Sequence, residues 1–444
     1  MTDGSSNRVL TKNCCGTAGY MPNRGGRRRR KTRMTDLSRE QQVVLACARY
    51  PMDIASVTLD GVDWERIFET ARALGVLTLV GWNLNAHFRE KVPVPVRETL
   101  QRLHHTAMTM SARMAARTAE VMRWFEAEGI EVLLLKGVAL SSLLYESPLL
   151  RLSSDIDVMV HPRDVPHAWQ MLKRRGVRPS YDFDEQQLDA LIRCGHAHDF
   201  CAFERELMID LHWGFLRWLC PLDVERVWRH AIKVCVDQRV YRTLSREDHL
   251  LLLCAHPVKH RYADMRGICD IAGILRVGSD LDWDYIRNQA RAHGQEQILW
   301  TGIRLAEELL GAPVSKAIQQ EMDTMASVMK RVREIKKRLL KKKNNWLTDS
   351  ATVWGWRMQD GWWRKTSYLF SKMFVPNEED FVWVSLPHPF FFAYYGIRFI
   401  RLPWRYLGII QRLHFQRTGL RIHESGGSIS PQRSANNSHQ KRHL

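Results

Sequence analysis

The feature that most constrains the fold is a change of hydrophobic period at Gly129. Before it, apolar residues between Val96 and Glu128 recur every three or four positions, as on one face of a long helix. After it, Ile130 to Leu135 is an aliphatic run typical of a buried strand. The chain therefore needs both helices and a sheet. The helical stripe, which we expect in the core, comprises Leu100, Leu103, Ala107, Met110, Met114, Val121 and Phe125.

Two further segments alternate polar and apolar residues, as a half-buried strand must. They are Ser153 to Val160 and Glu206 to Trp213. Helical spacing predicts the remaining elements over 63–84, 139–145, 165–175 with a C-cap at Gly176, and 221–325. The pattern indicates an α+β fold within a predominantly helical chain.

Asp155 and Asp157 stand two positions apart in the second predicted strand, so their carboxylates project from one face. Two like charges this close repel unless a cation lies between them. Asp210 is the only charged residue in the middle of the third predicted strand. The three acids form a candidate catalytic and metal site for Mg²⁺ or Mn²⁺, in which bound metal would activate an attacking hydroxyl and hold a polyphosphate. Asp-x-Asp alone is a weak signal, because many solvated strands contain it.

The turn at Lys136-Gly137 lies between the first strand and the acidic pair. A glycine there lets backbone N–H groups approach phosphate oxygens. The alternative is a solvated charge at the end of a strand.

The stretch LLLKGVALSSLLYESPLLRLSSDIDVMVHPRDVPHAWQMLKRRGV resembles the bacterial uncharacterised nucleotidyltransferase family of the DNA polymerase β-like superfamily. Further resemblances are DWERIFETARALGV near the N-terminus, IDLHW at 209–213 and CAHPVKHRYADMRGICDIAGIL at 254–275. The resemblance covers roughly 37–415. It implies a mixed sheet flanked by helices, with Asp155 and Asp157 as metal ligands and Asp210 as a third ligand or base. It also implies transfer of a nucleoside monophosphate from an NTP to an unknown acceptor.

One departure concerns the nucleotide site. Members of the wider superfamily have Gly-Ser or Gly-Gly before the acidic pair, whereas Val138 follows Gly137 here and the nearest hydroxyls are Ser141 and Ser142. We therefore expect nucleotide binding by Lys136, Gly137, Ser141 and Arg151, with Arg151 able to grip phosphate through two nitrogens. For Tyr145 we favour a packing role.

Two other functions remain open. The poor glycine turn motivates a catalytically degenerate binding or scaffold subunit of a biosynthetic complex. A glycosyltransferase would also use Asp-x-Asp, but it needs a nucleotide-binding strand before the pair, and 37–128 is patterned as helix throughout.

Several histidines and charged residues have spacings that could indicate a function, but a structural explanation is also available for each. His256 and His260 have metal-ligand spacing, but Pro257 lies between them and no Glu does, which favours a structural or acceptor-binding role. His196 and His198 with Asp199 read as an exposed loop. His212 points into the cleft or bonds across strands. Arg266 and Asp270 form an intrahelical pair or line the cleft.

The net charge of +18 is concentrated in two places. Residues 1–34 carry nine Lys/Arg against Asp3, and Arg331 to Lys343 is a second cluster. Such runs are usually solvated tails or helix faces, so nucleic-acid binding is the less favoured interpretation. The expected regions are a disordered basic tail over 1–36, helices over 37–128, the nucleotidyltransferase core over 129–235, cleft-covering helices over 236–325, a basic and aromatic-rich region over 326–422 and a disordered tail over 423–444. Met34 is an alternative start.

Nine scattered cysteines without CxxC pairs indicate reduced, mostly buried thiols. With no signal peptide and no long apolar run, we expect a cytoplasmic protein. Phe381 to Ile410 is aromatic, with Arg398, Arg401 and Arg405 at helical spacing. We favour a helix packed on the body with its arginines pointing outward over an amphipathic helix that makes peripheral contact with an anionic membrane. The oligomeric state is not encoded in these patterns.

Overall fold

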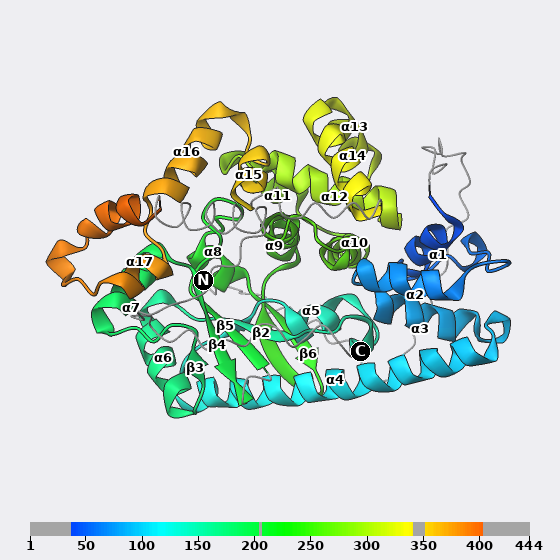
Figure 1. Ribbon diagram of the computed structural model, residues 1–444, viewed down its shortest axis with the longest axis horizontal. Coiled ribbons are helices and arrows are strands. Elements are labelled where there is room, and N and C mark those ends of the chain that lie inside the picture. The colour runs from blue at the N-terminus through cyan, green and yellow to red at the C-terminus, as the bar shows by residue number, and fades with distance from the viewer. Residues whose placement is uncertain (1–36, 204–206, 341–350, 403–444) are drawn as a thin grey trace, which may run out of the picture.

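The computed structural model describes residues 37–203, 207–340 and 351–402, and both expected tails, with Met34, lie outside these ranges. The described chain folds around a seven-stranded mixed sheet with helices on both sides, which confirms the α+β class (Figure 1). The strand order is β3-β4-β5-β2-β1-β7-β6, in which β2 pairs with β5 and β1 pairs with β7 in parallel. The strands are β1 (Leu133–Leu134), β2 (Asp155–Met159), β3 (Arg178–Pro179), β4 (Ala197–Ala202), β5 (Leu207–His212), β6 (Ile232–Val236) and β7 (Arg239–Thr243).

The helices surround this sheet in groups. In Figure 1 the long α4 runs beneath the sheet, α9 to α12 lie above it, and α1 to α3 and α16 to α17 stand at opposite ends. Their bounds are α1 (Arg39–Cys47), α2 (Trp64–Ala73), α3 (Leu77–His87), α4 (Val94–Ala127), α5 (Gly137–Leu144), α6 (Val165–Arg174), α7 (Glu185–Cys194), α8 (Val224–His230), α9 (Arg246–Lys259), α10 (Arg266–Val277), α11 (Trp283–Ala292), α12 (Glu296–Leu310), α13 (Lys316–Thr324), α14 (Ala326–Leu340), α15 (Ala351–Arg357), α16 (Gly361–Phe374) and α17 (Glu378–Trp383).

The N-terminal helices differ from the expectation at two points. The single helix predicted over 63–84 is wrong, because Gly75 adopts a left-handed φ of 70° and separates α2 from α3. The long helix α4 is confirmed, and Val121 and Phe125 pack against the sheet. Met110, however, is 50% exposed rather than in the core. Helical spacing identified the stripe but not how far along the helix the core extends.

The hairpin of β6 and β7 interrupts the region predicted to be helical, so that prediction is wrong for 232–243, including the first residues of the expected helical region 236–325. The two strands are joined by Asp237 and Gln238, both with positive φ (47° and 65°). This conformation matches the twist of a tight hairpin. Asn-Gly or Asp-Gly is its usual sequence signal, and Asp-Gln lacks the glycine.

Strand β4 also replaces an expected exposed loop. His198 is only 1% exposed, and its Nδ1 lies 3.0 Å from Glu378 Oε1. The interpretation of an exposed loop is therefore wrong for His198, which ties α17 to the sheet. The alternation of the buried His198 and Phe200 with the exposed Asp199 is the strand signal that was missed.

In the C-terminal described region the arginine side chains point inward, whereas the sequence predicted that they point outward. Arg398 and Arg401 are each 6% exposed and form ion pairs with the buried Asp380 of α17, 2.8 and 2.6 Å away. The prediction that these arginines point outward is wrong, because a buried carboxylate recruits both of them. Arg405 lies outside the described residues. No described helix has the length and apolar content needed to cross a bilayer.

The seven cysteines in the described ranges are free thiols. Cys47, Cys220, Cys254 and Cys269 are buried, whereas Cys235 is exposed on β6. Burial raises the pKa of the Cys47 thiol to about 12, which keeps that thiol protonated and unreactive. This agrees with the expectation of reduced, mostly buried cysteines.

Candidate active site

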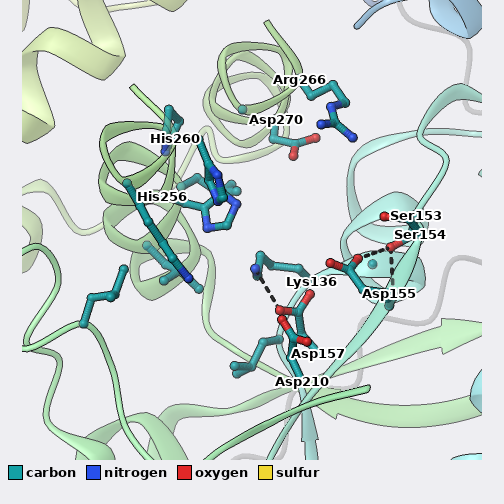
Figure 2. Close-up of a pocket in the computed structure, with 18 of the residues that line it drawn as sticks. Lys136, Ser153, Ser154, Asp155, Asp157, Asp210, His256, His260, Arg266 and Asp270 are labelled. Atoms are coloured by element: carbon teal, nitrogen blue, oxygen red, sulfur yellow. Dashed lines mark hydrogen bonds and ion pairs between the residues drawn. The ribbon is translucent and has the colours of Figure 1, made fainter. Parts of the chain in front are cut away.

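A cleft of about 400 Å³ lies between strands β2 and β5 and the connection from α9 to α10. The volume is within the range of small-molecule sites. Acidic side chains project from the strands, and histidines and cations face them from the helices (Figure 2). The cleft therefore has an acidic wall on the sheet and a basic wall on the helices.

Asp157 and Asp210 form the centre of the acidic wall. They are register partners on the parallel strands β2 and β5, so their side chains leave the sheet on the same face. The alternate residues Ile156 and Ile209 are buried in the core, which holds the acids toward the cleft. Asp157 itself is only 3% exposed. A carboxylate this buried requires a compensating charge.

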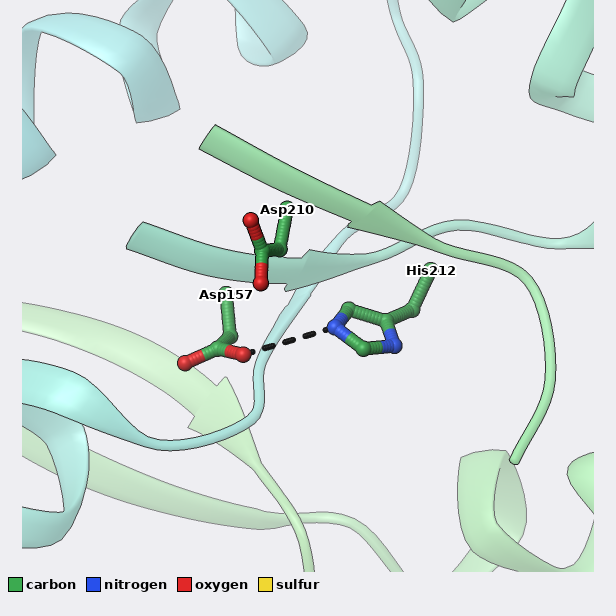
Figure 3. A group of neighbouring side chains, drawn as sticks. All are labelled: Asp157, Asp210 and His212. Carbon is green, nitrogen blue, oxygen red and sulfur yellow. Dashed lines mark ion pairs between the residues drawn. The ribbon is translucent and has the colours of Figure 1, made fainter. Parts of the chain in front are cut away.

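His212 completes a three-residue cluster with these acids (Figure 3). One ligand atom from each of Asp157, Asp210 and His212 lies within 4.8 Å of the others. His212 Nε2 is 3.4 Å from Asp157 Oδ1, and this buried nitrogen has no hydrogen-bond partner among the described residues. Two carboxylates and an imidazole nitrogen that makes no hydrogen bond suit a divalent cation. Of the two expectations for His212, the structure agrees with the one in which it points into the cleft.

The electrostatics of the two acids differ. Burial acts to raise the pKa of Asp157, but Lys136 and His212 outweigh it and hold that pKa below its ordinary value. Burial and the neighbouring Asp157, Asp199 and Asp155 raise the pKa of Asp210 to about 7. Asp157 is therefore a permanent anion, whereas Asp210 can exchange a proton near neutral pH.

Asp155 lines the same cleft but stands apart from the cluster. Its Oδ1 accepts a hydrogen bond from Ser153 Oγ at 3.1 Å. The sequence predicted Asp155, Asp157 and Asp210 as the metal set, whereas the compact set contains His212 in place of Asp155. The structure brings all four into one cleft.

Lys136 supplies a counter-charge for Asp157. It follows β1, and its Nζ lies 2.8 Å from Asp157 Oδ1, within ion-pair distance but outside the angles of a directed hydrogen bond. Gly137 has a φ of 57°, and a Cβ there would meet Ser153 Oγ at 3.3 Å. The glycine thus permits both the turn and the close approach of the serine loop.

The other two residues predicted to bind nucleotide are engaged elsewhere. Arg151 donates from Nε to Asp270 Oδ1 at 2.8 Å and from a terminal nitrogen to the Gly137 carbonyl at 3.1 Å. Arg151 lines the cleft, but its guanidinium braces the turn after β1. Ser141 is 1% exposed, its hydroxyl donates to the Pro148 carbonyl at 3.4 Å, and it is not among the residues that line the cleft. Ser153 and Ser154 are the serines that line the cleft.

The basic wall comes from the end of α9 and the start of α10. It comprises His256, Lys259, His260 and Arg266. Burial, with Lys136 and His260 nearby, lowers the pKa of His256 to about 2, so this ring is neutral. Lys259 forms no ion pair with any residue in the described ranges. Of the two expectations for Arg266 and Asp270, the structure agrees with the one in which both line the cleft. They do not pair with each other, since Arg266 binds Asp264 at 2.7 Å and Asp270 binds Arg151.

Two residues from β4 and the turn before it were missed as cleft residues. Asp199 is the register partner of Asp210 on the other side of β5, and both Asp199 and His196 line the cleft. Burial lowers the pKa of His196 to about 3. The alternating pattern of 197–202 would have placed Asp199 on the acidic face.

Comparisons with known proteins agree with this geometry at the family level. The sequence model of a family described as "Uncharacterised nucleotidyltransferase" matches residues 60–311, more than half of the chain and all the cleft residues named above. No curated protein matches the chain. Among solved structures, the solution structure of the antibiotic-resistance factor ANT(2'')-Ia aligns over 41% of this chain and 94% of that chain, with 12% identity and a TM-score of 0.30. A TM-score this low carries no argument about the fold.

Proposed function

We propose that this chain, which belongs to the family of uncharacterised nucleotidyltransferases, transfers a nucleoside monophosphate from an NTP to an acceptor in a reaction that requires a divalent cation. The observation that carries the proposal is the cluster of Asp157, Asp210 and His212 at the base of a cleft with an opposing basic wall. The identity of the base and of the acceptor stays open.

The donor set fits a metal ion, because the buried His212 Nε2 has no other partner in the described chain. Asp157, Asp210 and His212 would hold Mg²⁺ or Mn²⁺, which would polarise a phosphate oxygen and lower the pKa of an acceptor hydroxyl. Carboxylates suit both ions, and the imidazole is a ligand that transition metals accept more readily. We therefore expect Mn²⁺ to support the reaction at least as well as Mg²⁺.

The remaining residues divide the work of binding and proton transfer. Lys259 and Arg266 would take the polyphosphate on the basic wall, where Lys259 has no competing ion pair in the described chain. An acceptor oxygen would attack the α-phosphorus, the bond from that phosphorus to the β-phosphate oxygen would break, and pyrophosphate would leave. Asp210, which the family resemblance implies as a ligand or base, would accept the proton of the acceptor hydroxyl.

The direct experiment measures pyrophosphate release from each of the four NTPs in the presence of fractionated lysate as the source of acceptor. We expect release that depends on Mg²⁺ or Mn²⁺ and falls at least about 100-fold in Asp157→Asn. The matched control is Asp284→Asn, which removes a carboxylate whose side chain is 91% exposed and lies outside the cleft. Release that is equal in Asp157→Asn and wild type would refute the proposal.

A second candidate is a degenerate binding or scaffold subunit, and the Lys136–Asp157 ion pair favours it. This pair neutralises the buried carboxylate without a metal. The two candidates separate in a binding measurement with labelled NTP. A scaffold would bind nucleotide equally with and without Mn²⁺, and its binding would survive Asp157→Asn. An enzyme would lose nucleotide binding when Mn²⁺ is omitted and also in Asp157→Asn.

A further inference from the structure

An outward-facing apolar surface covers the C-terminal described helices. On α16, Trp362, Phe370 and Met373 recur at helical spacing and are 73%, 62% and 48% exposed. Along 393–402, which is helical, Phe399 and Ile400 are 56% and 60% exposed. We name these residues, with Trp363 at 70% exposure, the aromatic platform.

The two helices present one continuous surface rather than separate side chains. Phe374 contacts Phe370 with ring centroids 4.2 Å apart and stacks on Phe399 at 6.1 Å. Phe374 thereby joins the exposed side chains of α16 to those of the helix over 393–402. Figure 1 shows these segments at the end of the molecule opposite α1 to α3.

The orientation of the platform is built into the packing. Arg398 and Arg401 flank the outward Phe399 and Ile400, and Asp380 holds both arginines inward. The same region is anchored to the core, since His198 binds Glu378 and Gln187 donates to the Phe381 carbonyl at 2.8 Å. A buried ionic network thus holds the apolar side chains outward. Their exposure to water is unfavourable, and a partner that covered them would remove this cost.

The charge around the platform points to an anionic partner. Lys372, on α16 beside the platform, forms no ion pair in the described ranges. The chain that follows, 403–444, carries seven Lys/Arg against one acidic residue, Glu424. A second copy of a chain with net charge +18 would be repelled from this region.

We propose that the aromatic platform docks on the surface of an anionic lipid bilayer. Trp and Phe side chains insert at the level of the headgroups, and nearby lysines attract acidic lipids. This surface is separate from the cleft, and the proposal does not depend on nucleotidyl transfer.

The test is flotation of the full chain with vesicles of phosphatidylcholine alone and of phosphatidylcholine mixed with phosphatidylglycerol. We expect binding to the mixed vesicles, weakened by salt because surface charges are screened. The substitutions Trp362→Ala/Trp363→Ala should lower the affinity at least about tenfold, and Lys372→Gln should lower it only on the mixed vesicles. The matched control is Met108→Ala/Met110→Ala, which removes two exposed methionines on the distant α4 (47% and 50% exposed).

Circular dichroism and thermal unfolding establish that each variant is folded. Phe399→Ala/Ile400→Ala provides a second platform variant if the tryptophan pair does not fold. Absence of flotation by the wild type overturns the proposal, as does equal flotation of the platform variants and the control. Sedimentation that shows a dimer dissolved by the platform substitutions, without flotation, would assign the surface to a second copy instead.

Discussion

Asp157 and Asp210 are register partners on the parallel strands β2 and β5, and the protein shifts their pKa values in opposite directions. Lys136 and His212 favour the charged form of Asp157, whereas burial and the charge of Asp157 favour the protonated form of Asp210. One carboxylate is thus a fixed charge and the other can exchange a proton. This division follows from the Lys136 ammonium and the His212 ring, which both lie against Asp157.

The first prediction concerns coupling between these two acids. Because both belong to one cluster, removal of either should abolish the same step. Asp157→Asn and Asp210→Asn should each lower pyrophosphate release by at least about 100-fold. The double variant should release pyrophosphate only slightly more slowly than the less active single variant. Losses that multiply in the double variant would show that the two acids act separately. Steady-state assays of the three variants measure this.

The second prediction concerns Lys136, whose ammonium contacts Asp157 Oδ1 at 2.8 Å. Lys136→Met makes the cluster more negative by one charge. Mn²⁺ alone should then bind several-fold more tightly, while pyrophosphate release should fall at least about tenfold because a lysine expected to bind the nucleotide is lost. Electron paramagnetic resonance of free Mn²⁺ measures the first effect. Weaker Mn²⁺ binding in Lys136→Met would contradict the assignment of the cluster.

The third prediction concerns the buried ion pair of Arg151 and Asp270, whose side chains are 18% and 4% exposed. Asp270→Leu leaves the guanidinium without a partner and should lower the free energy of unfolding by about 3 kcal/mol. Arg151→Met/Asp270→Leu removes both charges and should recover most of that loss. Guanidinium chloride denaturation of the single and double variants decides the outcome, and an additive double variant would argue against coupling.

The fourth prediction concerns acid stability. His249 is fully buried, its Nε2–H donates to the Leu135 carbonyl at 2.8 Å, and burial lowers its pKa from 6.5 to about 4. Below pH 6.5 the unfolded chain binds a proton that the folded chain does not, so the His249 contribution is complete above pH 6.5 and is lost as the pH falls toward 4. Between pH 7.5 and 5 this loss amounts to about 2 kcal/mol.

His249→Gln keeps a donor for the Leu135 carbonyl and removes the titrating ring. The difference in unfolding free energy between the two pH values should therefore be about 2 kcal/mol smaller in His249→Gln than in the wild type. Chemical denaturation at both pH values checks this. An unchanged difference would mean that other groups account for the acid sensitivity.

Several parts of the site could be predicted because they depend on local alternation. In a strand, side chains two positions apart share a face, so the orientation of Asp155 and Asp157 followed from the amino-acid order alone. The same rule placed Asp210 and His212 together on β5. The family resemblance at Lys136-Gly137 and the acidic pair is likewise carried by contiguous residues, and the match over 60–311 confirms the family. The catalytic and ligand roles of these residues stay predictions.

The sequence by itself determined the class of fold, the two strands that carry the acids and the side chains that each strand turns toward one face, because these properties depend on neighbours within a few positions. Only the tertiary structure decided the partners. Arg151 binds Asp270, 119 residues away, instead of standing free for phosphate, and Ser141 is buried while Ser153 enters the cleft. Asp380 turns two arginines inward and leaves aromatic rings exposed. Charged side chains pair with whichever opposite charge the packed core brings nearest, and this choice has no period along the chain.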